Sequence, residues 1–198
     1  MENVIRKMLS DSASLKQKVA EDQAAHKQLT EIASKLIQVV STGGTIYACG
    51  NGGSACDAMH FVEELTARYK RERDGVRAMH FMDGGMLTCW ANDYDYSSAF
   101  ERNVQTFCGP QDALIAISTS GNSENVLKAV RAAKVKQCTT IGLTGKTGGT
   151  LKDLADYCMI VPHQETDRIQ EVHILYIHIL CELIETELAD LLNVKVSD

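Results

Sequence analysis

The sequence predicts a three-layer α/β fold, in which a roughly five-stranded parallel sheet lies between two layers of helices. Short apolar runs alternate along the chain with segments of helical periodicity, which is typical of parallel strands joined by crossover helices. The run 113–117 is entirely apolar, as expected for a strand buried on both faces of a sheet. With 198 residues and 44% hydrophobic content, the chain can form one domain with a sizeable core.

Residues 2–41 contain neither proline nor glycine and predict an N-terminal pair of helices, the second ending near Gly43-Gly44. Apolar residues recur at helical spacing in both helices: Ile5, Met8, Leu9, Leu15 and Val19, then Leu29, Ile32, Ala33, Leu36, Ile37 and Val40. The remaining positions are mainly Lys, Gln, Glu and Asp, and we expect them to face solvent.

The core elements are expected in order from residue 42 onward. Strands are predicted at 45–49, 76–82, 113–117, 139–143 and 157–161, the last stopped by Pro162. Helices are predicted at 54–69, 87–90, 97–107, 124–134, 151–155 and 167–192, with a charged surface turn at 70–75. The apolar stripe of the last helix is expected to comprise Ile169, Val172, Leu175, Ile179 and Leu183. We find no repeat and no second domain, so residues 1–198 are expected to form one unit.

Charge and cysteine usage exclude several classes of protein. The net charge of −6 and the lack of a long Lys/Arg run argue against a nucleic-acid surface. No apolar run approaches the roughly 20 residues that cross a bilayer, and the N-terminus lacks a signal-peptide core, so no membrane partner is expected. The seven cysteines are scattered without a C-x-x-C pair, which favours a reducing cytoplasm and argues against disulfides. Cys49, Cys138 and Cys158 lie in strand-like runs and are expected to be buried.

Gly50-Asn51-Gly52-Gly53 follows the first core strand and precedes a predicted helix. Glycine permits unusual backbone angles and close approach of a ligand to the main chain, and Ser54 is expected to help cap the helix. A helix start of this kind favours anions or the hydroxyls of a polar ligand. The spacing is not that of a dinucleotide-binding loop.

The helix after this loop carries Asp57, His60 and Glu64 at i, i+3 and i+7, within roughly 60° of one another around the axis. His60 and Glu64 could share a metal or act as separate acid and base groups. Taken alone, such a pair is more often a surface or interface contact, but its position directly after a glycine loop favours function. Glu63 lies about 100° off this stripe and is expected to be solvated.

A second polar loop, 118–123, carries four hydroxyl side chains around Gly121, between a buried strand and a helix. Hydroxyls and free N–H groups at a helix start form a phosphate cradle without a lysine. The plainer interpretation is a turn with a serine cap, which would need fewer hydroxyls. The Gly-Lys-Ser/Thr ending of a nucleotide-hydrolysing loop is absent. Loops 50–54, 92–96 and 118–123 are expected at the carboxyl ends of the strands, so we expect them to converge at one edge of the sheet.

The last predicted helix carries Gln170 and His178, about 80° apart around the axis and separated by roughly 12 Å of rise. A single metal could bind both only if both side chains lean toward it. Otherwise one of them serves another role or another subunit. The plainer interpretation of His178 is a hydrogen-bonded core histidine, and His173 is expected to be peripheral and structural.

These residues together resemble the sugar isomerase (SIS) family, and most closely its phosphoheptose isomerase branch. The resemblance covers nearly the whole chain in order, through Cys49 to Ser54, Asp57 to Phe61, Glu63 to Thr66, Asn92-Asp93, Ile117 to Ser123, Leu143 to Lys146, Asp167 to Glu171, and His178.

The resemblance implies a SIS, flavodoxin-like fold and isomerisation of sedoheptulose 7-phosphate to D-glycero-D-manno-heptose 7-phosphate. That reaction is the first step toward bacterial surface heptose, as in lipopolysaccharide. It also implies a homotetramer with active sites at subunit interfaces, in which residues 1–41 serve oligomerisation.

The resemblance assigns a role to each matching site residue. Glu64 would be the catalytic base and His178 the acid. Zinc would be bound by His60, Glu64, Gln170 and His178. The substrate would contact Asn51, Gly52, Gly53, Glu64, Asn92, Asp93, Ser118, Thr119, Ser120, Ser123 and Gln170.

One question of mechanism and two alternative functions stay open at this point. Enediol chemistry needs a carboxylate near carbon and a donor or Lewis acid near oxygen, yet a metal-bound Glu64 is a weaker base. Glu64 could move between these roles or share its two oxygens. The first alternative function is a non-catalytic SIS scaffold that binds a replication initiator protein, although that branch lacks the acid and base positions. The second is isomerisation of another sugar phosphate, a choice on which the two tyrosines of loop 92–96 would bear.

Overall fold

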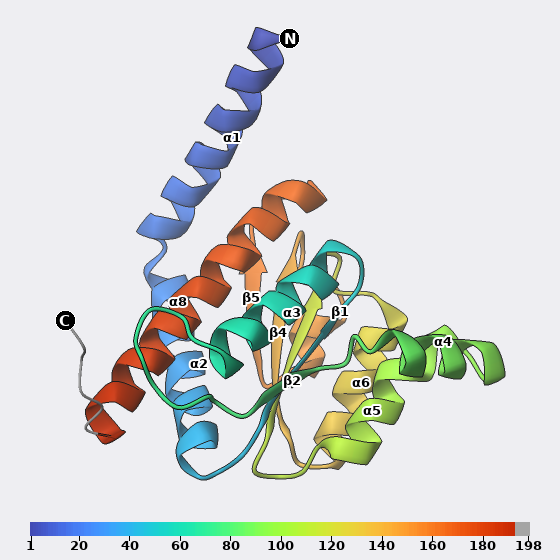
Figure 1. Cartoon of the computed structure of the whole chain (residues 1–198). Helices are drawn as coiled ribbons and strands as arrows, with labels where there is room; N and C mark the ends of the chain where they lie inside the picture. Colours follow the sequence, from blue (N-terminus) through green and yellow to red (C-terminus); the bar gives the residue numbers. More distant parts are fainter. Residues whose placement is uncertain (193–198) are drawn as a thin grey trace.

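The computed structural model describes residues 1–192 and contains a sheet of five parallel strands between two layers of helices (Figure 1). The strands are β1 (Ile46–Gly50), β2 (Ala78–His80), β3 (Ala113–Ser118), β4 (Thr139–Gly145) and β5 (Tyr157–Val161). They lie in the order β2-β1-β3-β4-β5, and every neighbouring pair is parallel. The predicted α/β class and strand number are therefore confirmed, and the strand order is that of flavodoxin-like folds.

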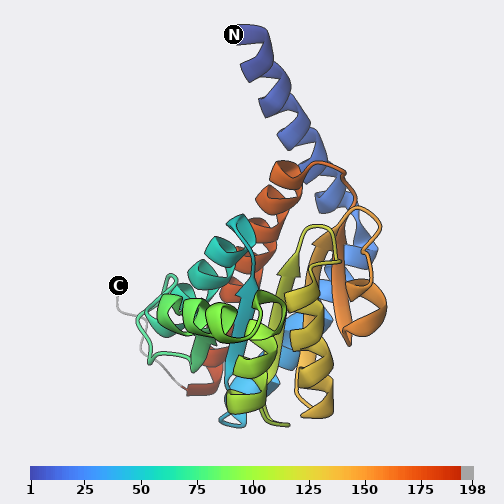
Figure 2. The same ribbon diagram turned by 90° about the vertical axis from the view of Figure 1, so that its right-hand side faces the viewer.

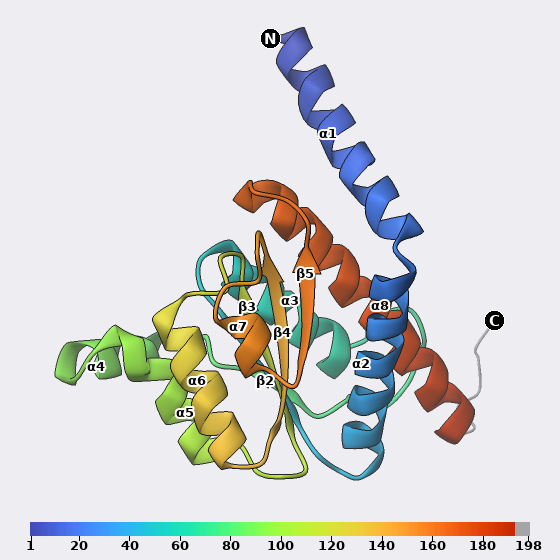
Figure 3. The same cartoon turned by 180° about the vertical axis from the view of Figure 1, so that it is seen from behind.

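The helices cover both faces of the sheet. They are α1 (Glu2–Glu21), α2 (Gln23–Ser41), α3 (Gly53–Thr66), α4 (Gly84–Asp93), α5 (Ala99–Phe107), α6 (Glu124–Val135), α7 (Leu151–Leu154) and α8 (Thr166–Leu192), with a 3₁₀ turn, η1 (Tyr96–Ser98). One buried cluster joins α2, α3 and α8 to one face of the sheet, and a second joins α5, α6 and α7 to the other (Figures 1 and 3). The sheet is thus covered on both sides, which explains why its central strands are so apolar.

Strand β3 shows how the sequence specifies these two cores. Ile115 and Ile117 pack into the cluster that contains α3 and α8, whereas Leu114 and Ala116 pack into the cluster that contains α6. All four side chains are fully buried. Because successive side chains in a strand point to opposite faces, an unbroken apolar run predicts burial on both.

The N-terminal helical pair forms as predicted and turns sharply at Asp22. The carboxylate of Asp22 accepts hydrogen bonds from the backbone N–H groups of Ala24 (2.9 Å) and Ala25 (3.1 Å), which caps α2. Helix α1 then extends away from the body of the molecule (Figure 2). Its C-terminal half buries Leu15 and Val19, whereas the apolar residues of its N-terminal half are exposed: Val4, Ile5, Met8 and Leu9.

Several predicted boundaries are wrong. The strand expected at 76–82 is limited to Ala78–His80, because the N–H of Val76 bonds to the carbonyl of Leu65 in the last turn of α3 rather than to β1. The loop expected at 92–96 begins later. Helix α4 starts at Gly84, capped by Asp83 on the N–H of Met86 (2.7 Å), and includes both Asn92 and Asp93. The helices expected at 54–69 and 97–107 are shorter, as α3 ends at Thr66 and α5 follows the η1 turn.

The buried face of α8 also differs from the predicted stripe. Ile169 and Val172 are buried as expected, but Leu183 is 36% exposed. The buried face instead continues through Tyr176, Ile177, Leu180, Cys181, Ile184 and Leu188. Helix α8 packs against α2, α3 and the sheet at once, so its buried face is broader than a single stripe.

His173 is not peripheral as predicted. It is fully buried, and its Nε2 atom lies 3.1 Å from the carbonyl oxygen of Thr144. Burial lowers the pKa of His173 from 6.5 to about 4. The imidazole is therefore neutral and donates to Thr144, which ties α8 to β4.

The cysteines behave as small buried or surface residues. All seven are free thiols, and Cys49, Cys138 and Cys158 are buried as predicted. Among residues 1–192, no helix has both the length and the apolar character needed to cross a membrane.

Candidate functional site

In the strand order β2-β1-β3-β4-β5, strands β1 and β3 are neighbours in the sheet although they are not consecutive in the sequence. Chain connections leave this point in opposite directions, and in open α/β sheets the loops that follow two such strands separate and border the ligand-binding crevice. The glycine loop after β1 and loop 118–123 after β3 border this crevice. The topology therefore places both predicted binding loops where open α/β sheets bind ligands.

The glycine loop leads directly into α3. Gly52 is the N-cap, with φ of +55°, a conformation that favours glycine. The expected cap by Ser54 is wrong, because no side chain caps α3 and Ser54 lies buried inside the first turn, where its N–H bonds to the carbonyl of Asn51. A Cβ atom at Gly53 would overlap the side-chain amide of Gln170, so glycine is needed for α8 to approach this loop.

Asn51 connects the glycine loop to two other segments. Its side chain makes a reciprocal pair of hydrogen bonds with Asn125 of α6, both 2.8 Å long. The hydroxyl of Tyr96 donates to Asn51 Oδ1 at 2.7 Å. At Asn51 the glycine loop therefore meets Tyr96 of segment 92–96 and Asn125, which lies two residues after loop 118–123. Asn125 and Tyr96 were missed in the sequence, because neither belongs to a recognisable motif and both depend on contacts distant in the chain.

Loop 118–123 is held in shape by its own polar groups and by Thr150, the residue before α7. Ser118 donates to Ser123 Oγ at 3.0 Å, and the Oδ1 atom of Asn122 accepts from the N–H and hydroxyl of Thr150 (2.9 and 3.0 Å). No side chain caps the start of α6, which begins directly after Ser123. An uncapped helix start surrounded by the hydroxyls of Ser118, Thr119, Ser120 and Ser123 is suited to bind an anion.

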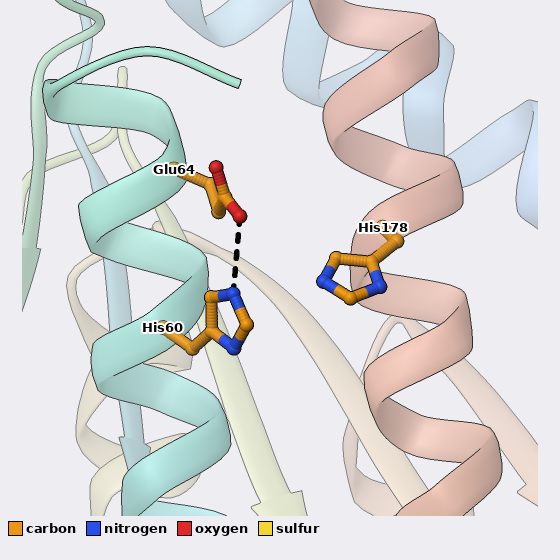
Figure 4. Close-up of side chains that lie close together, drawn as sticks. All are labelled: His60, Glu64 and His178. Atoms are coloured by element: carbon orange, nitrogen blue, oxygen red, sulfur yellow. Dashed lines mark hydrogen bonds and ion pairs between the residues drawn. The ribbon is translucent and has the colours of Figure 1, made fainter. Parts of the chain in front are cut away.

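His60 and Glu64 of α3 face His178 of α8 across the gap between the two helices (Figure 4). His60 Nε2 lies 3.0 Å from Glu64 Oε1, and one ligand atom from each of the three residues lies within 4.8 Å of the others. The predicted stripe on α3 is thus confirmed for this pair, and His178 is a partly exposed member of this cluster rather than an isolated core histidine.

Two rings orient His178. Tyr69 stacks on it with ring centroids 5.9 Å apart and an interplanar angle of 25°. His60 meets it edge-on, with centroids 5.1 Å apart. Tyr69 was not identified in the sequence, where it marks only the end of an amphipathic helix.

The three residues offer two imidazole nitrogens and a carboxylate, the donor set of many catalytic zinc sites. Without a metal, the same groups can act as a proton acceptor beside proton donors. Gln170 lies about two helical turns from His178 along α8, against Gly53. The structure therefore brings three of the four expected ligands together and places Gln170 at the glycine loop.

Asp57 lies one turn before His60. Burial raises its pKa from 3.8 to about 6, against the opposing effect of His60. Its Oδ2 atom is buried and has no hydrogen-bond partner within residues 1–192. A buried polar atom of this kind usually accepts from water or ligand, which makes Asp57 a further candidate for the site.

Asn92 and Asp93 are exposed at the end of α4. Asn92 donates to Asp93 Oδ1 at 2.9 Å, and Cys89 lies one turn earlier against Asp93 Oδ2. Their expected contact with substrate stays a prediction, because these bonds are confined to α4.

A buried ion pair holds α3 and α8 together beyond the three site residues. Glu185 of α8 accepts from the N–H groups of Lys70 (2.9 Å) and Arg71 (3.0 Å) and from Arg73. Arg73 in turn donates to the carbonyl oxygens of Glu64 and Leu65, both at 2.8 Å. The segment 70–75 is therefore not simply the charged surface turn expected, since the side chain of Arg73 is only 4% exposed.

Comparison with known proteins identifies related chains over most of this length. The SIS domain family matches residues 9–145. The phosphoheptose isomerase of Vibrio cholerae serotype O1 is 46% identical over 189 residues, which cover 95% of this chain and 99% of that protein. The phosphoheptose isomerase of Helicobacter pylori is 47% identical over 191 residues, or 96% of this chain and 98% of that protein.

Solved structures agree with these relatives. A phosphoheptose isomerase from Francisella tularensis superposes with a TM-score of 0.89 at 31% identity, covering 93% of this chain and 97% of that chain. The enzyme of the same name from Neisseria gonorrhoeae gives a TM-score of 0.87 at 35% identity, covering 93% and 98%.

Proposed function

This chain belongs to the SIS domain family and, within it, to the phosphoheptose isomerases, and we propose that it converts sedoheptulose 7-phosphate to D-glycero-D-manno-heptose 7-phosphate. This reaction is the first step of bacterial heptose biosynthesis. The observation that carries the proposal is the convergence of Glu64 and His178 from different helices within one small cluster. A scaffold without catalysis would have no need for a carboxylate and an imidazole placed in this way.

The reaction moves a proton between C1 and C2 through an enediol, so it needs a base near carbon and a proton donor near oxygen. Glu64 serves as the base, since its carboxylate is partly exposed at the gap between α3 and α8. His178 serves as the acid, held by Tyr69 and His60 so that its ring faces this gap. Proton donation to the oxygen and proton removal from carbon can then occur on one substrate without large movements.

The substrate would lie between the two binding loops of the crevice. Its phosphate would be bound by the hydroxyls of Ser118, Thr119, Ser120 and Ser123 and by the uncapped start of α6. Its sugar would contact Asn51, Gly52 and Gly53, with Gln170 beside them. Asn92 and Asp93 complete the proposed set, and as exposed residues they are open to the sugar or to a neighbouring subunit.

We propose zinc as the cofactor, bound by His60, Glu64 and His178, with Gln170 as the fourth ligand. Zinc–nitrogen distances of about 2.0–2.1 Å in a tetrahedral site place ligand atoms roughly 3.4 Å apart. The three ligand atoms already lie within 4.8 Å of one another, so small side-chain rotations suffice. Gln170 reaches the same ion only if its side chain leaves Gly53. Bound zinc would polarise the sugar carbonyl, while the two oxygens of Glu64 allow one to bind metal and the other to accept a proton.

A homotetramer with active sites at subunit interfaces is supported by the exposed apolar residues of α1. Met8 and Leu9 are 47% and 68% exposed on a helix that extends from the body of the protein. Isolated exposed apolar residues are ordinary, but a row of them on a projecting helix indicates a surface that another subunit covers. Residues 1–41 would therefore serve oligomerisation.

We propose the cytoplasm as the location of the protein, because its free cysteines suit a reducing compartment.

The test is turnover of a panel of ketose phosphates by the purified full-length chain. Sedoheptulose 7-phosphate should give the highest kcat/KM, exceeding fructose 6-phosphate and ribulose 5-phosphate. A higher value for either shorter sugar would identify a different substrate. A lack of turnover of any of them, with and without added zinc, would contradict the proposal.

A further inference from the structure

We propose that Asn125 is a positioning residue, which turns the side-chain amide of Asn51 so that Asn51 meets the sugar only as a hydrogen-bond donor. This inference rests on the proposed isomerase function and adds the way in which one sugar contact is oriented. Asn125 belongs to α6, two residues after Ser123, and its side chain is only 4% exposed. It therefore reaches the site through Asn51 and does not itself touch substrate.

The direction of the amide pair is fixed by a backbone group. The N–H of Val126 lies 3.0 Å from one terminal atom of Asn125, and an N–H can only donate, so that atom is the oxygen. The other terminal atom of Asn125 is then an amino group, and it donates to Asn51 at 2.8 Å. The atom of Asn51 that accepts must be its oxygen, and its amino group donates back to Asn125. A backbone group at the start of α6 thus determines the orientation of an amide in the glycine loop.

After its contacts within the protein, the side chain of Asn51 has one unused hydrogen-bonding group, an N–H donor. An amide oxygen accepts two hydrogen bonds, and Asn51 Oδ1 already accepts from Asn125 (2.8 Å) and from the hydroxyl of Tyr96 (2.7 Å). Of the two amino hydrogens of Asn51, one is bonded to Asn125. The other has no partner among residues 1–192, and Asn51 is half-buried rather than enclosed. Asn51 therefore offers one N–H to a ligand and no acceptor.

A fixed donor complements a particular sugar oxygen. During isomerisation through an enediol, the former carbonyl oxygen gains negative charge. A preorganised N–H stabilises such an oxygen, whereas a misplaced carbonyl would repel it. The chemistry assigned to Asn51 is therefore donation to the carbonyl and enediolate oxygen. Without Asn125 the amide of Asn51 could rotate, and its oxygen would compete for the same position.

The test compares Asn125→Leu and Asn125→Asp with the wild type. Leu removes both bonds of the pair at similar volume. Asp keeps the acceptor for Val126 but can no longer donate to Asn51. We expect both variants to lower kcat by roughly tenfold to a hundredfold, with a smaller change in KM. Tyr96→Phe keeps the amide pair and should lower kcat less than either. The matched control is Asn103→Leu, another buried asparagine on a helix, which bonds Ala99 and Met86. It should alter thermal stability but leave kcat unchanged.

Ligand binding separates positioning from a structural role. A six-carbon aldonohydroxamate phosphate mimics the enediolate, whereas the seven-carbon alditol phosphate has no carbonyl. Both Asn125 variants should bind the hydroxamate about tenfold or more weakly, with alditol phosphate affinity nearly unchanged. Equal weakening of both ligands, or kcat equal to that of the wild type, would overturn the inference. If the wild type neither turns over sugar phosphates nor binds the hydroxamate, the isomerase function itself fails, which is a different result.

Discussion

The Nε atom of Arg73 lies 3.0 Å from Oε1 of Glu185, and the two side chains are 4% and 1% exposed. Through this pair, the end of α3 that carries Glu64 is fastened to α8, the helix that carries His178. The distance between the proposed base and acid therefore depends on a contact outside the site. A buried charge that loses its partner is strongly destabilising, so this contact should be visible in stability measurements.

Glu185→Gln should lower the free energy of unfolding by about 3 kcal/mol, because Arg73 would remain buried without its charged partner. Denaturant unfolding at a fixed protein concentration measures this value, since oligomers unfold in a concentration-dependent manner. Glu187→Gln, on an exposed position of the same helix, is the matched control and should change stability by less than about 0.5 kcal/mol. Equal effects of the two substitutions would show that the ion pair contributes little.

His173 makes stability depend on acidic pH. Burial lowers its pKa to about 4, whereas in the unfolded chain it titrates near 6.5. Between these values the unfolded state binds the extra proton, so stability is full above pH 6.5 and is lost as pH falls toward 4. The loss amounts to about 2 kcal/mol at pH 5.

Unfolding of wild type and His173→Gln at pH 7 and pH 5 checks this dependence. The free energy of unfolding at pH 7 minus that at pH 5 should be about 2 kcal/mol smaller in the variant than in the wild type. His26→Gln, which alters an exposed histidine, should leave the difference unchanged. A wild-type pH dependence retained in His173→Gln would assign it to other groups.

Ser123→Ala should weaken recognition of the phosphate group. Its hydroxyl lies at the uncapped start of α6 and accepts from Ser118. Loss of one hydrogen bond to a charged group should raise KM for the phosphorylated sugar roughly tenfold, and inhibition by inorganic phosphate should weaken by a similar factor. Ser34→Ala, an exposed serine on α2, serves as control. An unchanged phosphate inhibition constant in Ser123→Ala would place the phosphate elsewhere.

His178→Ala should abolish zinc binding, because it removes one of the three converging ligands. Protein purified without chelator should contain about one zinc per chain by metal analysis, and the variant should contain almost none. His163→Ala, which alters a histidine outside the cluster, should retain the metal. Metal-free wild type with full activity would contradict the zinc proposal.

The sheet could be predicted from the sequence because local pattern and burial coincide there. Leu114 to Ile117 are apolar without interruption, and the structure buries each of them completely. The stripe of His60 and Glu64 could be predicted for a similar reason, since helical spacing alone sets which side chains share a face.

The remaining features depend on partners far away in the chain. Arg73 appeared to belong to a surface turn, but it is buried and bonds to Glu185, which is separated from it by 112 positions. The cap expected from Ser54 failed because Gly52 takes a positive φ that places Ser54 inside the helix. Leu183 matched the predicted stripe of α8, but the neighbouring α2 and α3 determine which side of that helix is buried.

The central claim is that Glu64 removes a proton from the carbon next to the carbonyl of sedoheptulose 7-phosphate. The most direct measurement is deuterium incorporation into this sugar in deuterated water, with wild type and Glu64→Gln compared at matched folding. With the wild type we expect deuterium at that carbon. With the variant we expect incorporation to be at least about a thousandfold slower, which is the order of the rate loss seen when an essential catalytic group is removed. Incorporation by Glu64→Gln at the wild-type rate would contradict the account, as would turnover by the wild type without any exchange.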